Sequence, residues 1–330
     1  MKKILLLATG GTIASKPTGE GLAPSITSEE LLAFVPELGE ICHVDAMQLF
    51  SLDSTNVYQP HWRAIAQTVK EQYDAYDGFV VAHGTDTMAY TAAALSYMIQ
   101  NSRKPVVLTG SQKSIYNRDS DARNNLIKAF LYAVSDEAWG VHIAFDNKVI
   151  LGTRARKVRT KSFNAFDSID FPETAVFSDH RLIQFMPTPE DLGEPEWYFD
   201  LEPGVFVLRL VPGMSSEVLS WLQGRCRAVV VEGFGVGGLP LYGDESFAAA
   251  MRRWVDQGGL AVLTTQVPHE GSDLGVYAVG SAAKDLPGVV EARNMTQEAI
   301  VVKLMWALGR TQDREEALRL FTTPICHDIL

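Results

Sequence analysis

The chain has 330 residues, more than one compact core usually holds, so we expect two domains. Its composition is 46% hydrophobic and 21% charged, which excludes disorder as the main state of the chain. The 29 Lys and Arg residues against 40 Asp and Glu residues give a net charge of −11, so neither nucleic acid nor an anionic membrane surface is an expected partner.

The first apolar run, Ile4–Ala8, imitates the start of a signal peptide, but the glycine-containing segment 9–12 ends it. A signal peptide needs an apolar region of about 7–15 residues, so we interpret the run as a buried first strand. No apolar stretch approaches the ~18 residues of a membrane span. The three cysteines are far apart in sequence, which argues against a disulfide framework and predicts a cytoplasmic protein.

Short apolar runs recur along the chain. They are continuous instead of alternating, which indicates strands that are buried on both faces of a parallel sheet. The runs are Ile4–Ala8, Gly78–Ala82, Pro105–Thr109, Val141–Phe145, Val205–Leu210, Ala228–Glu232 and Leu260–Thr265.

Segments with helical periodicity separate these runs. Thr27 and Glu30 have the spacing of a capping box at the start of one helix. Near the end of the chain, Asn294 or Thr296 caps a helix for which Gly309 is the expected stop. The alternation of strands and helices predicts an α/β fold.

A proline-rich, acidic stretch divides the chain. Residues 187–204 contain four prolines and six acidic residues, which is typical of a linker. We therefore expect a larger N-terminal domain, 1–186, with a mostly parallel sheet flanked by helices. Residues 205–330 form the second expected domain, a smaller flavodoxin-like α/β unit.

Two of the predicted strands end in matching polar clusters. The first strand ends at Thr9-Gly10-Gly11-Thr12, and Gly78–Ala82 is followed by His83-Gly84-Thr85-Asp86-Thr87. Ligands of parallel sheets bind at the carboxyl ends of strands, where glycines admit close approach and threonines offer hydroxyl groups. Either cluster alone is better read as a tight turn with a helix cap. Two such clusters in one domain favour a binding or catalytic site.

A threonine hydroxyl becomes a good nucleophile only when another group takes its proton. Lys157 lies in a segment with Arg154 and Arg156, and a desolvated lysine there can serve as the base. Spacing alone would favour a basic surface loop.

The chain resembles the L-asparaginase family, in particular the cytoplasmic bacterial type I enzymes. The resemblance covers essentially the whole chain. It is carried by Ala8–Ala14, Asp53–Thr55, His83–Thr91, Leu108–Gln112, the segment around Lys157, and Ala299–Leu308.

The resemblance implies catalytic roles for four residues. Thr12 corresponds to the nucleophile that attacks the side-chain amide of L-asparagine and forms a β-aspartyl ester. Thr85, Asp86 and Lys157 correspond to the family's second triad, which helps to activate a nucleophile or water. The family needs neither a metal nor an organic cofactor, and its members are homodimers or homotetramers.

The resemblance also implies how the substrate is held. Asp86 would pair with the substrate ammonium group, and Ser54 and Thr55 would hold its α-carboxylate. Asp53 and Ser111 lie in matching motifs and are expected among the substrate-binding residues. The preference between asparagine and glutamine depends on a single methylene and is left open.

The sequence departs from the family at two places. Leu22 occupies the loop position where many members carry a tyrosine, and leucine cannot relay a proton. Val267 follows Gln266 where some type I enzymes have cysteine, in a segment that binds an allosteric asparagine in some relatives.

Three alternatives stay open. Residues 233–238 match G-x-G-x-x-G, the fingerprint of a nucleotide-binding oxidoreductase, but Pro240 and Gly243 prolong a loop where that fold requires a helix. A non-catalytic amino-acid sensor would retain the same pocket. The related amidotransferase subunit that feeds ammonia to misacylated tRNA carries an added N-terminal domain, whereas the first strand here begins at Ile4. The seven histidines show no metal-binding spacing, and His83 is expected to pack beside the sheet.

Overall fold

A computed structural model describes residues 1–19, 21–179, 181–243, 245–276, 283 and 285–330. The chain divides into two compact units, Met1–Phe199 and Asp200–Leu330. A short strand inside the expected linker, β14 (Glu196–Trp197), pairs with β6 (Ile99–Gln100) and belongs to the first unit. The domain boundaries expected from the sequence stay a prediction.

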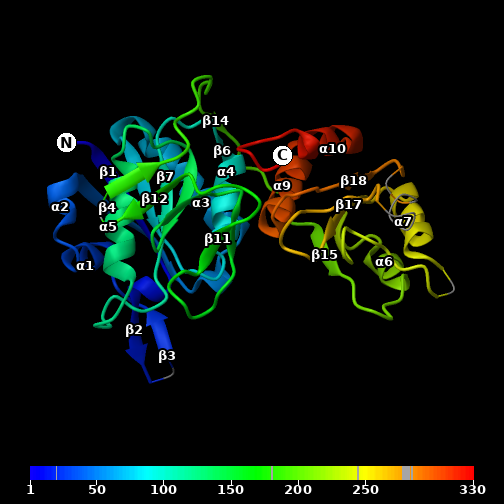
Figure 1. Ribbon diagram of the computed structural model, residues 1–330, viewed down its shortest axis with the longest axis horizontal. Coiled ribbons are helices and arrows are strands. Elements are labelled where there is room, and N and C mark those ends of the chain that lie inside the picture. Colours follow the sequence, from blue (N-terminus) through cyan, green and yellow to red (C-terminus); the bar gives the residue numbers. More distant parts are fainter. Residues whose placement is uncertain (20, 180, 244, 277–282, 284) are drawn as a thin grey trace. The chain divides into compact units, whose positions relative to one another are not determined.

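The first unit is built on an eight-stranded sheet in the order β13-β12-β9-β8-β7-β5-β1-β4. Figure 1 labels β1, β4, β7 and β12 of this sheet. The five strands from β8 to β4 in this order are parallel, and β9, β12 and β13 are antiparallel to their neighbours. This confirms the mostly parallel sheet. The strands are β1 (Lys3–Gly10), β4 (His43–Leu52), β5 (Gly78–Ala82), β7 (Val106–Thr109), β8 (Val141–Phe145), β9 (Lys148–Leu151), β12 (Ala175–Ser178) and β13 (Arg181–Gln184).

Helices flank this sheet. The helices are α1 (Ser28–Ala33), α2 (Leu38–Ile41), α3 (Gln59–Gln72), α4 (Met88–Met98) and α5 (Ala122–Ala133). Side chains of α1, α2 and α5 form one hydrophobic cluster with Ile4 and Leu6 of β1. The capping box of α1 is confirmed, because the Thr27 hydroxyl accepts from the Glu30 N–H at 3.2 Å and the Glu30 carboxylate accepts from the Thr27 N–H at 3.0 Å.

Several short elements lie in the connections between the strands and helices of the first unit. A hairpin of β2 (Ser15–Thr18) and β3 (Gly21–Pro24) follows the 3₁₀ helix η1 (Thr12–Ala14). A second 3₁₀ helix, η2 (Ser54–Asn56), follows β4. The strands β10 (Ala155–Lys157) and β11 (Phe166–Ser168) form an antiparallel pair.

The second unit contains a four-stranded parallel sheet in the order β15-β16-β17-β18. This confirms the smaller parallel α/β unit. Its elements are β15 (Val205–Arg209), α6 (Glu217–Leu222), β16 (Ala228–Gly233), α7 (Phe247–Asp256), β17 (Leu260–Thr265), β18 (Val289–Glu291), α9 (Gln297–Arg310) and α10 (Arg314–Thr322).

Two sequence expectations in this unit are decided by the structure. Thr296, not Asn294, caps α9, and its hydroxyl accepts from the Ala299 N–H. The expected stop at Gly309 is wrong, because α9 continues through Arg310. A Cβ atom at Gly309 would lie 2.4 Å from the carbonyl oxygen of Asp200, so the glycine permits a close approach of the chain.

The glycine-rich segment 233–238 does not open a helix. Phe234 and Gly238 form an isolated β-bridge, and α7 begins only at Phe247 with Ser246 as its cap. The geometry therefore lacks the strand–turn–helix arrangement of a dinucleotide site. Within the described parts of the chain, no helix has the length and apolarity to cross a bilayer.

A buried ion pair fastens the C-terminal segment to α9. The ammonium of Lys303 lies 2.6 Å from the Asp328 carboxylate, and both side chains are fully buried. Lys303 also donates to the carbonyl of Thr323, and the Ile325 N–H donates to Asp328. Burial lowers the pKa of Lys303, and the charge of Asp328 opposes this shift.

We expect Asp328→Asn to lower the free energy of unfolding by about 3–5 kcal/mol, because it leaves the Lys303 ammonium buried without its counter-charge. Urea denaturation followed by circular dichroism measures the loss. Glu316→Gln is the matched control, since it breaks an exposed pair with Arg319 in the same unit and should change little. Equal effects of the two substitutions would contradict the expectation.

Candidate active site

The parallel strands β1 and β5 are neighbours close to the β4 edge of the large sheet, so their carboxyl ends lie side by side. The backbone bends after β1 at Gly10 and Gly11, which have φ values of 106° and 78° that favour glycine. A Cβ atom at Gly11 would lie 2.3 Å from the Cα atom of Gly84. The segments that carry Thr12 and Thr85 are therefore in direct backbone contact.

The segment after β4 joins these carboxyl ends. A Cβ atom at Gly84 would lie 2.7 Å from the Ser54 side chain, and the Thr87 hydroxyl donates to the Ser54 carbonyl at 2.7 Å. Asp53 caps this turn, since its carboxylate accepts from the N–H and the hydroxyl of Thr55 at 2.9 and 2.8 Å. Ser54 is buried and Thr55 is exposed. The segments that follow β1, β4 and β5 thus bring their polar groups together at the carboxyl ends of these strands.

Lys157 reaches these carboxyl ends from β10. Its ammonium donates to the Thr85 hydroxyl at 2.7 Å and lies 2.6 Å from the Asp86 carboxylate. The Lys157 side chain is 14% exposed, whereas that of Asp86 is 60% exposed, so the lysine is shielded and the carboxylate is open to solvent. The structure brings Thr85, Asp86 and Lys157 together in one hydrogen-bonded cluster.

Thr12 and Ser111 are predicted site residues whose side chains make no hydrogen bond to this cluster among the described residues. The half-buried Thr12 side chain has no hydrogen-bond partner among the described residues. The Ser111 hydroxyl donates to the Lys113 carbonyl and is buried, so it is engaged in a turn. The side chain of Leu22 lies outside the part of the structure that is described.

His83 is a buried neutral imidazole. Its Nδ1 donates to the Gly84 carbonyl at 2.7 Å and its Nε2 accepts from the Thr91 hydroxyl at 3.0 Å. Thr91 in turn accepts from the indole N–H of Trp62 at 2.9 Å. Burial lowers the pKa of His83 to about 4, so it stays uncharged at neutral pH. Its packing beside the sheet is confirmed.

Gln112 also contacts the cluster, although we predicted no role for its side chain. Its carbonyl oxygen accepts from the Thr85 hydroxyl at 3.3 Å. The carboxylate of Asp121, which is buried, accepts from the backbone N–H of Gln112 at 2.9 Å. The only sequence signal for Gln112 is its place at the end of the motif 108–112, since the sequence does not show which distant hydroxyl an amide will meet.

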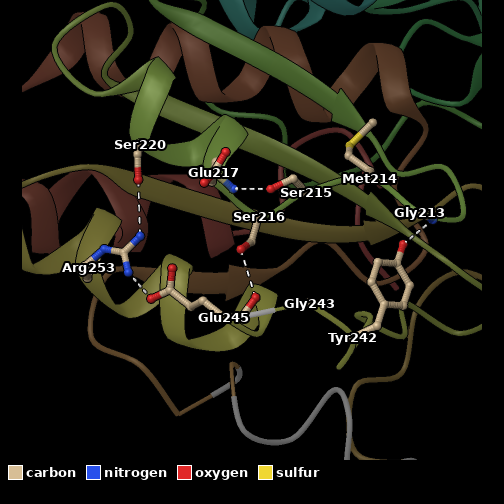
Figure 2. Close-up of a pocket in the computed structure, with 10 residues that line it drawn as sticks. All are labelled: Gly213, Met214, Ser215, Ser216, Glu217, Ser220, Tyr242, Gly243, Glu245 and Arg253. Atoms are coloured by element: carbon tan, nitrogen blue, oxygen red, sulfur yellow. Dashed lines mark hydrogen bonds and ion pairs between the residues drawn. The ribbon is translucent and has the colours of Figure 1, made fainter.

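The His, Cys, Asp and Glu side chains of the described residues form no group of three or more that could hold a metal ion. A cavity of about 580 Å³ lies in the second unit and contains none of the predicted site residues (Figure 2). Its polar groups bond to one another: Arg253 contacts Glu245 and donates to Ser220, and Tyr242 accepts from the Gly213 N–H.

Fold and cluster together define a two-unit α/β enzyme with hydroxyl groups and a lysine at the carboxyl edge of its larger sheet. Two family models match the chain. Asparaginase, N-terminal, matches residues 3–189, and the Glutaminase/Asparaginase C-terminal domain matches residues 204–321. The chain therefore belongs to the asparaginase family of amidohydrolases.

Individual relatives agree over nearly the full length. The L-asparaginase of Thermococcus kodakarensis is 40% identical over 99% of both chains, and L-asparaginase 1 of Escherichia coli is 33% identical over 95% of this chain and 94% of its own. A glutamyl-tRNA(Gln) amidotransferase subunit of Pyrococcus furiosus is 38% identical over 99% of this chain and 76% of its own length. Solved structures of L-asparaginases from T. kodakarensis and Vibrio cholerae superpose with TM-scores of 0.92 and 0.85, at 38% and 29% identity, and coverage is at least 99% of each chain.

Proposed function

We propose that this protein hydrolyses the side-chain amide of L-asparagine to L-aspartate and ammonia. The observation that carries the proposal is the hydrogen-bonded cluster of Thr85, Lys157 and Asp86 beside the segment of Thr12. The full-length similarity to L-asparaginases from two organisms supports the choice of substrate.

The proposed reaction has two steps. The Thr12 hydroxyl attacks the amide carbonyl carbon, its proton passes to the leaving nitrogen, and the C–N bond breaks to release ammonia. Water then hydrolyses the β-aspartyl ester and returns a proton to Thr12. In this proposal Lys157, as the neutral amine, accepts the proton through Thr85, whose hydroxyl lies 2.7 Å away, and returns it in each step.

The remaining site residues bind the substrate in this proposal. The open carboxylate of Asp86 pairs with the substrate ammonium, and the η2 turn of Ser54 and Thr55 receives its α-carboxylate. Asp53 fixes this turn through its two bonds to Thr55. Backbone N–H groups near Thr85 stabilise the oxyanion, an effect worth roughly 3–4 kcal/mol per donor in other hydrolases. Ser111 is proposed to shape the pocket through its turn.

The proposed setting is the cytoplasm, supported by the small number of cysteines, three, which are far apart in the sequence. We further propose a homodimer or homotetramer, an expectation that rests on the family. Neither a metal nor an organic cofactor takes part in the proposed reaction.

We expect the purified protein to release ammonia from L-asparagine without any added cofactor and with full rate in EDTA. An enzyme-coupled ammonia assay, run in parallel with L-glutamine, measures the activity and the selectivity. A requirement for a metal or for NAD would overturn the proposal. Binding of asparagine without ammonia release would instead identify the amino-acid sensor.

A further inference from the structure

We propose that Gln112 is a positioning residue that fixes the direction of the Thr85 hydroxyl in the catalytic cluster. The inference rests on the proposed function and adds a residue to it. A threonine hydroxyl has a single proton to donate and lone pairs that accept. The donor and acceptor partners of Thr85 therefore decide which way its proton points.

The partners of Thr85 lie on two sides of its oxygen. In the protonated form that pairs with Asp86 in this structure, Lys157 has no lone pair and can only donate to the oxygen at 2.7 Å. The Gln112 carbonyl oxygen can only accept, and it lies 3.3 Å away. Thr85 is 4% exposed, so bulk water cannot replace either partner. While Lys157 is protonated, the hydrogen bonds thus run from Lys157 through Thr85 to Gln112, and these contacts hold the Thr85 oxygen beside Lys157.

The side-chain amide of Gln112 is held in the orientation that this series of hydrogen bonds requires. Its Nε2 group donates to the carbonyl oxygens of Ser162 and Arg159 at 3.0 and 3.5 Å. Because these partners are acceptors, they fix the nitrogen on their side and leave the Oε1 atom for Thr85. The same amide therefore ties the connection between β10 and β11 to the Thr85 segment.

The backbone of Gln112 is anchored separately. The Asp121 carboxylate accepts from the N–H groups of Gln112 and Lys113 and from the side-chain amide of Asn125. Asn125 also donates to the Gly110 carbonyl. A side chain with a fixed backbone and a fixed amide nitrogen has little freedom, which suits a group that must hold a neighbour's rotamer.

Removing the Gln112 carbonyl leaves the Thr85 proton without an acceptor in a buried place, which is unfavourable. The Thr85 side chain then turns to find another partner and loses its alignment with Lys157. We expect Gln112→Met to lower kcat for L-asparagine by about 10- to 100-fold, the size of effect that a misplaced reacting group produces. KM should change by less than about threefold, because Gln112 is outside the proposed substrate-binding groups.

A double-mutant cycle separates positioning from a general structural effect. In a Thr85→Ser background, which keeps the hydroxyl, Gln112→Met should cause its full loss of kcat. In a Thr85→Val background, which has no hydroxyl to orient, it should cause little further loss. Equal losses in both backgrounds would overturn the proposal. Gln100→Met is the matched control, because Gln100 also donates to a backbone carbonyl but lies in β6, and the kcat of this variant should be unchanged.

A glutamate variant and a crystal structure provide two further tests of the positioning role. Gln112→Glu keeps an acceptor oxygen for Thr85 and loses the donor to Ser162, so it should retain more activity than Gln112→Met. If Gln112→Met does not fold, Gln112→Glu alone tests the positioning role. A loss of kcat in Gln112→Glu as large as that in Thr85→Val would then refute this role. A crystal structure of Gln112→Met should show Thr85 rotated away from Lys157, whether or not asparagine is the substrate. An unmoved Thr85 contradicts the positioning role, whereas a wild-type protein that releases no ammonia refutes the proposed function.

Discussion

Replacing Thr12 with alanine is expected to lower kcat for L-asparagine by about 10³-fold or more. The change removes the only atom of this residue that can form an acyl-enzyme, and it leaves the shape of the pocket nearly intact. Since Thr12 has no hydrogen-bond partner among the described residues, its loss should leave no buried partner group unpaired. Substrate should still bind through Asp86, Ser54 and Thr55.

The measurement pairs steady-state kinetics with mass spectrometry of the acid-quenched enzyme. Wild-type protein should carry a β-aspartyl ester on Thr12, and the Thr12→Ala variant should carry none. Thr68→Ala is the matched control, because its hydroxyl only donates to a carbonyl within α3 and its loss should spare kcat. An ester found on Thr85 would reverse the assignment of the two threonines.

Except for β15, the strands that the sequence predicts are buried on both faces. Ile4–Ala8 and Gly78–Ala82 are continuous apolar runs because neighbours and helices cover them completely. The edge strands β4 and β13 were not predicted, because the prediction relied on continuous apolar runs. Exposed residues interrupt the partly buried ones along both strands, so neither presents a continuous apolar run. Hydrophobicity therefore identifies most of the buried strands, but it missed the interior strands β9 and β12 and it found the edge strand β15.

The residues of the candidate site could likewise be predicted only in part from the sequence. The glycines beside Thr12 and Thr85 signal strand ends, and their backbone contact follows from the adjacency of β1 and β5. Lys157 is 72 residues from Thr85, and no local pattern relates the two. Only the family resemblance linked them. Gln112 was not assigned a role because its contact depends on the turn that Asp121 organises.

Lys157→Met is expected to lower kcat by about 10²–10⁴-fold, the usual contribution of a general base. Methionine keeps most of the apolar stem and removes the ammonium that contacts Thr85 and Asp86. Lys157→Arg tests the nature of the role, because arginine keeps the positive charge but does not release its proton. Activity retained in the arginine variant would show that charge suffices and that no proton passes through Lys157.

Combining Lys157→Met with Thr85→Val tests whether the cluster of Lys157 and Thr85 acts as a unit. Lys157 and Thr85 share one hydrogen bond of 2.7 Å, so removing either partner should disable the same proton route. The double variant should then be about as slow as the slower single variant, instead of showing the product of the two losses. Lys104→Met is the matched control, because Lys104 donates to backbone carbonyls of Tyr73 and Tyr76 and its replacement should add to the other losses independently. Multiplicative losses for Lys157 and Thr85 would mean that the two residues act on separate steps, and the proton route to Thr12 would then have to run outside this cluster.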